Sequence, residues 1–265
     1  MENFMSYRAI FSDIDGTMLN CEHQISPRTL TAIRNVISRG IPFILVSARS
    51  PLAITPFIDT IGSKLPFIAY NGALILDGEM REIYSMPLED VDFCQLEDEL
   101  ESLSNLSLNY YQGEHWYSPN PNNTWTIREG DITKLRALDK PASQLTSVHK
   151  ILVMGEAPRI LALEKHLRLA YPHLGVHRSK DEYLEIVNRA ATKAPAIQFM
   201  ENYFGIKVEE IVAFGDNYND LDMLRYAGYG VAMGNAPEDI KAQVSHVTAT
   251  NEEDGLAQVL EALFP

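Results

Sequence analysis

The strongest indication of the fold is the segment Ala9-Ile10-Phe11-Ser12-Asp13-Ile14-Asp15-Gly16-Thr17-Met18-Leu19. The apolar run from Tyr7 to Phe11 predicts a buried strand, and two carboxylates one residue apart follow it, before a glycine that permits a tight turn. Because ligands bind at the carboxyl ends of strands in open α/β sheets, we expect Asp13 at a strand tip and Asp15 in the loop beyond it. Such close carboxylates repel each other unless a cation or a shared proton relieves them, and Mg²⁺ prefers oxygen ligands. A turn with no function is the plainer alternative.

Length, composition and charge limit the classes of protein to which the chain can belong. The chain has 265 residues, of which 46% are hydrophobic, and its formal net charge is −14. This length allows one large domain or two of ordinary size. The acidic balance argues against a nucleic-acid-binding surface, which is usually basic. An anionic substrate must therefore be attracted locally, by a metal or by a few Lys and Arg side chains.

From the sequence we expect neither a signal peptide nor a framework of paired cysteines. Cys21 and Cys94 lie far apart, so neither a disulfide framework nor a zinc site is indicated. Residues Met1–Met5 lack the basic start and apolar run of a signal peptide, and no apolar stretch approaches the length of a membrane span. We therefore expect a cytoplasmic protein with no membrane partner.

The first third of the chain alternates strands and helices. Helices are predicted to begin at Ser26-Pro27 and at Pro51, because serine caps helices and proline suits their first turn. Apolar runs at 42–46 and 67–70 predict strands, and Asp77-Gly78 signals a hairpin. This alternation is typical of a parallel sheet covered by helices.

The middle of the chain has a different character. It combines an acidic helix at 88–103, strands rich in Tyr and Trp at 107–117, a turn cluster at 119–124 and a helix at 157–171. Such a mixture is typical of an α+β domain. The α/β pattern then returns with a helix that Thr192 can cap.

These patterns predict an α/β protein with a doubly wound, mainly parallel, Rossmann-like sheet as its core. An α+β cap is inserted into that core. The expected segments are 1–86 and 188–265 for the core domain and 87–187 for the cap domain.

A second predicted strand tip also carries acids, Asp216 and Asp220, within Gly-Asp-Asn-Tyr-Asn-Asp. A third tip carries the hydroxyl of Ser47, and Lys193 lies at a helix start, where anions are favoured. Converging carboxylates would bind Mg²⁺ and leave positions for water or phosphate. Metal, hydroxyl, lysine and helix N-termini together suit a phosphoryl group, and a carboxylate nucleophile can form an aspartyl-phosphate.

In this order, Asp-x-Asp-Gly-Thr, a serine strand tip, a lysine helix start and Gly-Asp-x-x-Asn-Asp resemble the haloacid dehalogenase superfamily. The mid-chain insertion and the step Asn71-Gly72-Ala73 resemble its Cof-type phosphatases, which carry a large inserted cap. Two departures occur: Ser47-Ala48-Arg49 replaces the common Thr-Gly-Arg, and Lys193-Ala194-Pro195 replaces Lys-Gly. The hydroxyl is retained, whereas Pro195 lacks an N–H donor.

The resemblance implies a catalytic role for each acid. Asp13 would attack phosphorus, and Asp15 would protonate the leaving alcohol and then deprotonate water. The implied Mg²⁺ ligands are Asp13, Asp216 and the backbone carbonyl of Asp15. Asp220 either binds the metal directly or orients Lys193, and both alternatives stay open.

The resemblance also implies how the substrate is held. Ser47, Lys193 and Asn219 would bind the phosphoryl oxygens, although Asn219 and Asp220 also suit a plain helix start. Further candidate substrate contacts, each with a plain structural alternative, are Arg49, Asn71 and Asn188. Five aromatic residues of the cap could stack on a sugar or base, but such residues more often pack a sheet: Tyr110, Tyr111, Trp116, Tyr117 and Trp125.

The sequence thus predicts a Mg²⁺-dependent phosphomonoesterase, monomeric or homodimeric, that acts on a small soluble phosphate such as a sugar phosphate or flavin mononucleotide. The cap would close over the crevice, exclude water and select the leaving group. One alternative is a phosphomutase acting on sugar phosphates. Another is a non-enzymatic phospho-receiver or sugar-phosphate sensor, against which Asp15 and the size of the cap argue.

Overall fold

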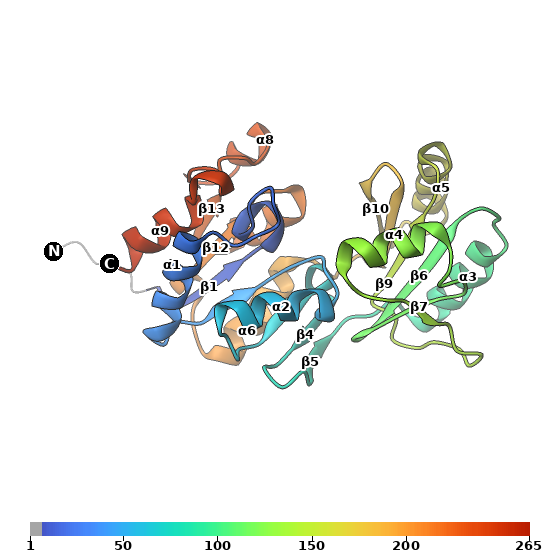
Figure 1. Cartoon of the computed structure of the whole chain (residues 1–265), viewed down its shortest axis with the longest axis horizontal. Coiled ribbons are helices and arrows are strands. Elements are labelled where there is room, and N and C mark those ends of the chain that lie inside the picture. The colour runs from blue at the N-terminus through green and yellow to red at the C-terminus, as the bar shows by residue number, and fades with distance from the viewer. Residues whose placement is uncertain (1–6) are drawn as a thin grey trace. The chain divides into compact units, whose positions relative to one another are not determined.

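The computed structural model describes residues 7–265, so the expectation that Met1–Met5 form no signal peptide lies outside the described part. The chain forms two compact units (Figure 1). The first contains the chain up to Ala48, Ile54–Tyr84 and Thr192–Pro265, and the second contains Arg49–Ala53 and Ser85–Ala191. The domain bounds expected from the sequence stay predictions.

A five-stranded parallel sheet forms the centre of the first unit, in the order β14-β13-β12-β1-β2. The strands are β1 (Ala9–Ser12), β2 (Phe43–Leu45), β12 (Ile211–Gly215), β13 (Tyr229–Ala232) and β14 (His246–Val247). The chain runs from β1 to β2 on one side and later returns through β12 on the other. The topological switch point, where ligands of such sheets bind, therefore lies between β1 and β12. This arrangement confirms the predicted α/β class.

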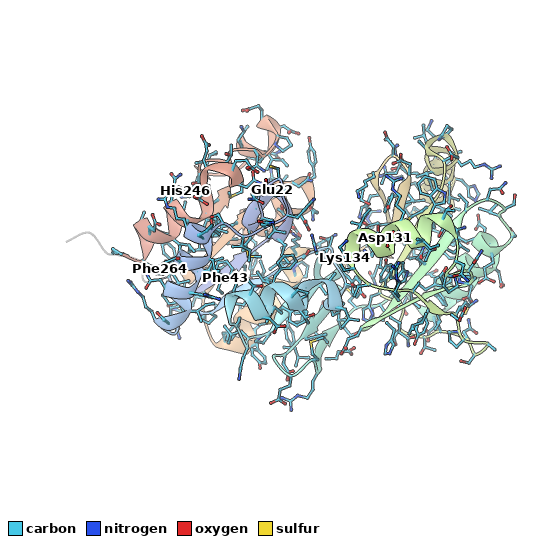
Figure 2. The ribbon with its side chains drawn as sticks, viewed as in Figure 1. Glu22, Phe43, Asp131, Lys134, His246 and Phe264 are labelled. Carbon is cyan, nitrogen blue, oxygen red and sulfur yellow. The ribbon has the colours of Figure 1, made fainter. Side chains whose placement is uncertain are left out.

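Both faces of this sheet are covered, as expected for parallel strands with continuous apolar sequences. On one face, Ala9 and Phe11 join a buried cluster with residues of α6 (Lys193–Phe204) and α7 (Leu221–Tyr226). On the other, α1 (Pro27–Ser38) packs against β2 and α9 (Gly255–Leu263). Figure 2 marks Phe43 on β2 and Phe264 after α9, and both side chains are buried.

The predicted helix start at Ser26-Pro27 is confirmed, because the Ser26 side chain accepts the Thr29 N–H at the first turn of α1. The second helix, α2, spans Pro51–Ile61. A small sheet of β3 (Phe67–Ala69), β4 (Leu74–Leu76) and β5 (Glu82–Ser85) follows. The remaining short elements of this unit are η1 (Ile14–Met18), η2 (Tyr70–Gly72), η3 (Val208–Glu210), η4 (Tyr218–Asp220), α8 (Glu238–Lys241) and η5 (Asn251–Glu253).

The second unit contains a six-stranded sheet in the order β10-β11-β9-β6-β7-β8. Its strands are β6 (Ser107–Gln112), β7 (His115–Ser118), β8 (Leu138–Asp139), β9 (Lys150–Met154), β10 (Leu174–Lys180) and β11 (Tyr183–Asn188). Residues of α3 (Asp90–Glu101) and α5 (Ala157–Ala170) form one buried cluster with Ile151 and Val153 of β9. This unit therefore has the expected α+β character.

One helix of the second unit was not predicted. The turn cluster at 119–124 leads directly into α4 (Thr124–Thr133), whose N-cap Asn123 accepts the Trp125 N–H. Within residues 7–265 the longest helix is α5, with 14 residues, and no helix there has the length and apolarity needed to cross a membrane.

The cap aromatics mostly pack the sheet. Tyr110, Tyr111 and Trp116 are buried. Tyr111 and Trp116 stack with ring centroids 5.7 Å apart, and the Trp116 indole N–H donates to Asn109 Oδ1 at 2.9 Å. For these three residues the structure supports packing rather than an open stacking surface.

Candidate active site

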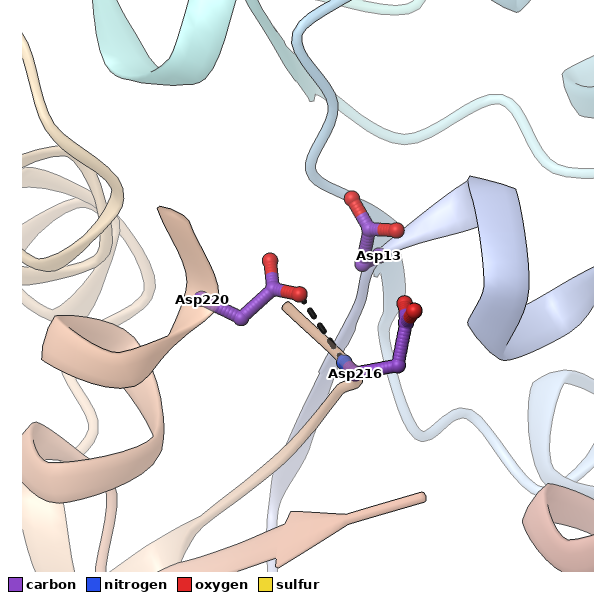
Figure 3. Close-up of side chains that lie close together, drawn as sticks. All are labelled: Asp13, Asp216 and Asp220. Atoms are coloured by element: carbon purple, nitrogen blue, oxygen red, sulfur yellow. Dashed lines mark hydrogen bonds between the residues drawn. The ribbon is translucent and has the colours of Figure 1, made fainter. Parts of the chain in front are cut away.

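Three carboxylates meet at the switch point of the first unit. Asp13 follows β1, Asp216 follows β12, and Asp220 ends η4. One carboxylate oxygen of each lies within 4.8 Å of the others (Figure 3). Gly215 permits this approach, because a Cβ on it would lie 2.4 Å from Asp220 Cβ. The structure therefore brings together the two acidic strand tips, as the sequence predicts.

Lys193 joins two of these acids. Its ammonium donates to Asp13 Oδ1 and Asp220 Oδ1, each at 2.5 Å, and to the Val46 carbonyl at 3.2 Å. A lysine has three N–H donors, and each here has an acceptor. Burial by itself lowers the pKa of the fully buried Lys193, but attraction to Asp13 and Asp220 outweighs burial and raises it. Lys193 is therefore charged beside the expected nucleophile.

The group carries more acids than bases. With all three carboxylates ionised, the single Lys193 ammonium would leave a net charge of −2. Burial raises the pKa of Asp13 well above its usual range, although the charge on Lys193 lowers it. Burial and the charge on Asp220 raise the pKa of Asp216 to about 6. One divalent cation would supply the missing charge, and carboxylate oxygens are the ligands Mg²⁺ prefers. The residues present therefore fit a Mg²⁺ site.

Asp220 uses both of its oxygens within the protein. Oδ1 accepts a hydrogen bond from the Lys193 ammonium, and Oδ2 accepts hydrogen bonds from the backbone N–H groups of Asp216 and Asn217, each at 2.9 Å. The Asp220 carboxylate thus holds the acidic loop, residues 215–220, in its conformation and keeps the Lys193 ammonium in place. These contacts favour the orienting role of Asp220 over direct metal binding.

The Asp216 carboxylate is held by the loop after β1. Thr17 Oγ1 donates to Asp216 Oδ1 at 2.9 Å. Gly16 has φ +79°, and a Cβ on it would lie 2.4 Å from Asp216 Oδ2. The sequence analysis missed Thr17, although its place in Asp-Gly-Thr, two residues after Asp15, is a usable signal.

Asp15 stands apart from the three-carboxylate group. Its side chain is 46% exposed, and Oδ1 lies 3.8 Å from His23 Nδ1. Access to solvent suits a group that exchanges protons with an alcohol and with water. Its acid–base role and its carbonyl contact to metal stay predictions.

The expected phosphate-binding residues lie close together in the first unit. Ser47 is buried after β2, and its backbone carbonyl accepts the Asn71 N–H. Asn219 Nδ2 donates to Asn71 Oδ1 at 3.0 Å. Asn71 has φ +55°, a left-handed conformation that asparagine tolerates. The next residue must be a glycine, Gly72, because a Cβ there would lie 2.2 Å from the carbonyl oxygen of Thr192, the residue just before α6.

The start of α6 contributes less to anion binding than the sequence suggests. The Ala194 N–H donates to Asp222 Oδ2 at 3.1 Å, and Pro195 has no N–H. The helix start therefore supplies the Lys193 ammonium, while neither of the next two residues offers a donor to phosphate. Sequence reasoning missed Asp222, which looks like an ordinary residue of the following helix.

Two candidate substrate contacts belong to the second unit, Arg49 and Asn188. Asn188 Nδ2 donates to the Pro87 carbonyl, and Asn188 Oδ1 accepts the Ala190 N–H, both at 3.0 Å. These bonds give Asn188 a structural role, where the chain enters and leaves this unit. The substrate contacts of Arg49 and Asn188 stay predictions.

The chain is similar to known hydrolases over most of its length. Residues 10–260 match the haloacid dehalogenase-like hydrolase family. The chain is 43% identical over 261 residues to a Haemophilus influenzae protein provisionally named a phosphatase, covering 98% of this chain and 100% of that protein. It is 30% identical over 268 residues to the 5-amino-6-(5-phospho-D-ribitylamino)uracil phosphatase of Bacillus subtilis, covering 95% and 96% of the two chains.

A solved structure shares the whole fold. The crystal structure of a haloacid dehalogenase-like hydrolase from Bacteroides thetaiotaomicron matches with a TM-score of 0.89 and 30% identity, covering 97% of this chain and 100% of that one. Because the family match spans most of the chain and the relatives are phosphatases, this chain belongs to the haloacid dehalogenase-like hydrolase family and is one of its phosphatases.

Proposed function

We propose that the chain hydrolyses a small soluble phosphate monoester in a Mg²⁺-dependent reaction, through an aspartyl-phosphate at Asp13. The observation that carries this proposal is the placement of Asp13. It is buried, it accepts a hydrogen bond from Lys193, and it lies in a group of three carboxylates whose oxygens are within 4.8 Å of one another.

In the first step, a carboxylate oxygen of Asp13 forms a bond to phosphorus while the bond from phosphorus to the leaving alcohol oxygen breaks. Asp15 donates its proton to that oxygen, so the alcohol leaves neutral. The Lys193 ammonium reduces the repulsion between the anionic nucleophile and the anionic phosphoryl group. Ser47 and Asn219 hold phosphoryl oxygens in line with Asp13.

In the second step, water attacks the phosphorus of the aspartyl-phosphate and gives one proton to Asp15. The bond between Asp13 and phosphorus breaks, which releases inorganic phosphate and restores both carboxyl groups for the next turnover. Bound Mg²⁺, held by Asp13, Asp216 and the Asp15 carbonyl, would supply positive charge that offsets the charge of the phosphoryl oxygens. Asp220 keeps Lys193 and the acidic loop in place.

The relatives support a substrate class. The Bacillus subtilis relative is named for an ester in which a phosphorylated ribityl chain is attached to a uracil. Sugar phosphates and flavin mononucleotide likewise carry phosphate on a sugar or sugar-alcohol chain. We therefore propose a phosphate ester of a polyhydroxylated small molecule as the substrate.

The test is phosphate release from a panel of sugar phosphates, flavin mononucleotide and ribityl phosphates, with Mg²⁺ and with a chelator. We expect Mg²⁺-dependent release that Asp13→Asn lowers on the order of a thousand-fold or more. The control is Asp181→Asn, which changes a carboxylate that is 79% exposed. Release that survives the chelator or the Asp13 variant contradicts the proposal. Transfer to a second hydroxyl without free phosphate indicates the phosphomutase.

A further inference from the structure

Two asparagines hold the loop that follows Asp15. Asn235 Nδ2 donates to the Gly16 carbonyl at 2.8 Å, and Asn251 Nδ2 donates to the Leu19 carbonyl at 2.8 Å. The asparagines are also joined to each other, because the Asn251 N–H donates to Asn235 Oδ1 at 3.0 Å. Asn235 and Gly16 are 219 positions apart in the sequence, so this contact exists only in the folded first unit.

The positions of both asparagines follow from the parallel sheet. Asn235 comes just after β13, the neighbour of the strand that leads to Asp216, and Asn251 begins η5. The backbone before each asparagine is tightly packed: the Gly234 N–H donates to the Ala249 carbonyl at 3.0 Å, and a Cβ on Gly234 would lie 2.8 Å from the Thr250 nitrogen. The end of β13 is therefore a fourth strand tip on the same edge of the sheet, beside those that precede Asp13, Ser47 and Asp216.

The amide of Asn235 has only one satisfactory orientation. Its oxygen accepts the Asn251 N–H, so its nitrogen must face the Gly16 carbonyl, and a flipped amide would lose both bonds. The Gly16 peptide lies between Asp15 and Thr17, whose hydroxyl holds Asp216. Glycine at φ +79° is the most freely rotating residue of this loop, so an external hydrogen bond to it restrains both neighbours.

We propose that Asn235 is a positioning residue for the phosphatase reaction. Through the Gly16 carbonyl it fixes the direction of Asp15 on one side and, through Thr17, the orientation of the Asp216 carboxylate on the other. Asn251 holds Asn235 in the donating orientation. The effect on Asp15 rests on the proposed function, whereas the effect on Asp216 governs metal binding whether or not the enzyme turns over.

The test compares substitutions of Asn235 in the 265-residue chain. Asn235→Asp keeps an acceptor for the Asn251 N–H but cannot donate to the Gly16 carbonyl, while Asn235→Ala loses both bonds. The Asn235 side chain is exposed, so neither change leaves a buried cavity. The matched control is Asn202→Asp, because Asn202 also is exposed and donates its side-chain N–H to a carbonyl, that of Gln198, at 3.0 Å.

Four quantities are measured: kcat and KM on the best substrate of the panel, Mg²⁺ affinity by calorimetry without substrate, and the melting temperature. For both Asn235 variants we expect kcat to fall about tenfold with KM within about twofold, because small misplacements of reacting groups are costly. We expect the Kd for Mg²⁺ to rise about threefold or more. In Asn235→Asp this rise would occur although the added negative charge attracts cations. Asn235→Gln, which keeps an amide donor, should recover part of both losses.

The outcomes separate this inference from the proposed function. If wild-type protein binds Mg²⁺ but releases no phosphate from any ester, the proposed function fails, and the Mg²⁺ affinities still decide the role of Asn235. Wild-type kcat and Mg²⁺ affinity in both Asn235 variants would overturn the inference. So would losses that only follow the melting temperature, or equal losses in Asn202→Asp, because a merely structural tie predicts those results.

Discussion

Lys193 and Asp13 are 180 positions apart in the sequence, yet the Lys193 ammonium donates to Asp13 Oδ1 at 2.5 Å. The same ammonium donates to Asp220, so one buried cation joins the expected nucleophile to the second acidic loop. Removing one partner of a buried ion pair leaves an uncompensated charge, which is strongly destabilising. The site is therefore a coupled unit rather than a set of independent acids.

Asp220→Asn tests this coupling. Both Asp220 oxygens accept hydrogen bonds, one from Lys193 and the other from the backbone N–H groups of Asp216 and Asn217. In either orientation of the Asn side chain, its amide nitrogen would therefore face a donor instead of an acceptor. We expect kcat/KM to fall about a hundred-fold, as when one charge-stabilising contact is lost from an active site. Steady-state kinetics provide the measurement, and Asp239→Asn, which alters an exposed acceptor of the Tyr218 hydroxyl, is the control. Turnover within twofold of wild type would contradict the coupling.

Gly16→Ala and Gly40→Ala form a matched pair. Both glycines have similar positive φ angles, +79° and +76°, so both variants incur a backbone cost of about 1 kcal/mol. A Cβ on Gly16 would collide with the Asp216 carboxylate, whereas nothing lies within 4 Å of a Cβ on Gly40. We expect both to lower the melting temperature, and only Gly16→Ala to abolish Mg²⁺ binding in calorimetry. Normal Mg²⁺ affinity in Gly16→Ala would show that Asp216 is not a ligand.

Asp222→Ala probes how α6 presents Lys193. Asp222 Oδ2 accepts the Ala194 N–H in the first turn of that helix, and loss of a helix-capping contact costs about 1 kcal/mol. We expect a reduction in kcat of about tenfold, since a displaced Lys193 no longer fits between its acids. Asp222→Asn keeps an acceptor oxygen and should restore most of the activity. Equal kcat in wild type and Asp222→Ala would show that Asp222 does not contribute to the site.

Mg²⁺ binding should weaken at acid pH. Burial and the charge on Asp220 raise the pKa of Asp216 from 3.8 to about 6. The metal-free folded state therefore retains this proton more strongly than the unfolded state, and the resulting stability is lost as pH rises through about 6. Mg²⁺ must displace the proton, so calorimetric affinity should fall as pH drops from 7 to 5. Asp216→Asn should bind Mg²⁺ weakly at all three values of pH 5, 6 and 7, with no such slope; a flat wild-type profile contradicts the assignment.

His149 makes the stability of the second unit depend on pH in the opposite direction. The Gly113 N–H donates to His149 Nδ1 at 3.1 Å, so Nε2 carries the proton and donates to Ser85 Oγ at 3.0 Å. Burial lowers the pKa of His149 from 6.5 to about 4. The unfolded state thus binds more protons between these values, and about 3 kcal/mol of stability present above pH 6.5 is lost as pH falls through about 4.

An NMR titration of the His149 ring should therefore give a pKa near 4. His149→Gln, whose amide can accept from Gly113 and donate to Ser85, should flatten the loss of melting temperature between pH 6.5 and 4. A ring that titrates near 6.5 would show that His149 is not buried in its neutral form.

The strands that precede Asp13 and Asp216 and the helices that begin at Pro27 and Lys193 were predictable from the amino-acid sequence. These features are local, because apolar runs, caps and turn residues act over a few positions. In a parallel sheet all strand tips lie on one edge, so local signals also predicted that the two acidic tips would meet. The helix α4 was missed because its N-cap Asn123 lies in a cluster of asparagines and prolines that equally suits a turn.

Which polar side chains contribute to the site could be seen only in the folded chain. Asn188 and Asn235 look alike in the sequence, but one bonds to Pro87 within the second unit and the other to Gly16 beside Asp15. Asp222 likewise gains its role by accepting the Ala194 N–H, and Thr17 gains its role by donating to Asp216. In both pairs the two residues are far apart in the sequence. A hydrogen bond needs its two atoms within about 3 Å, and packing of the whole chain, rather than any local preference, brings such atoms together.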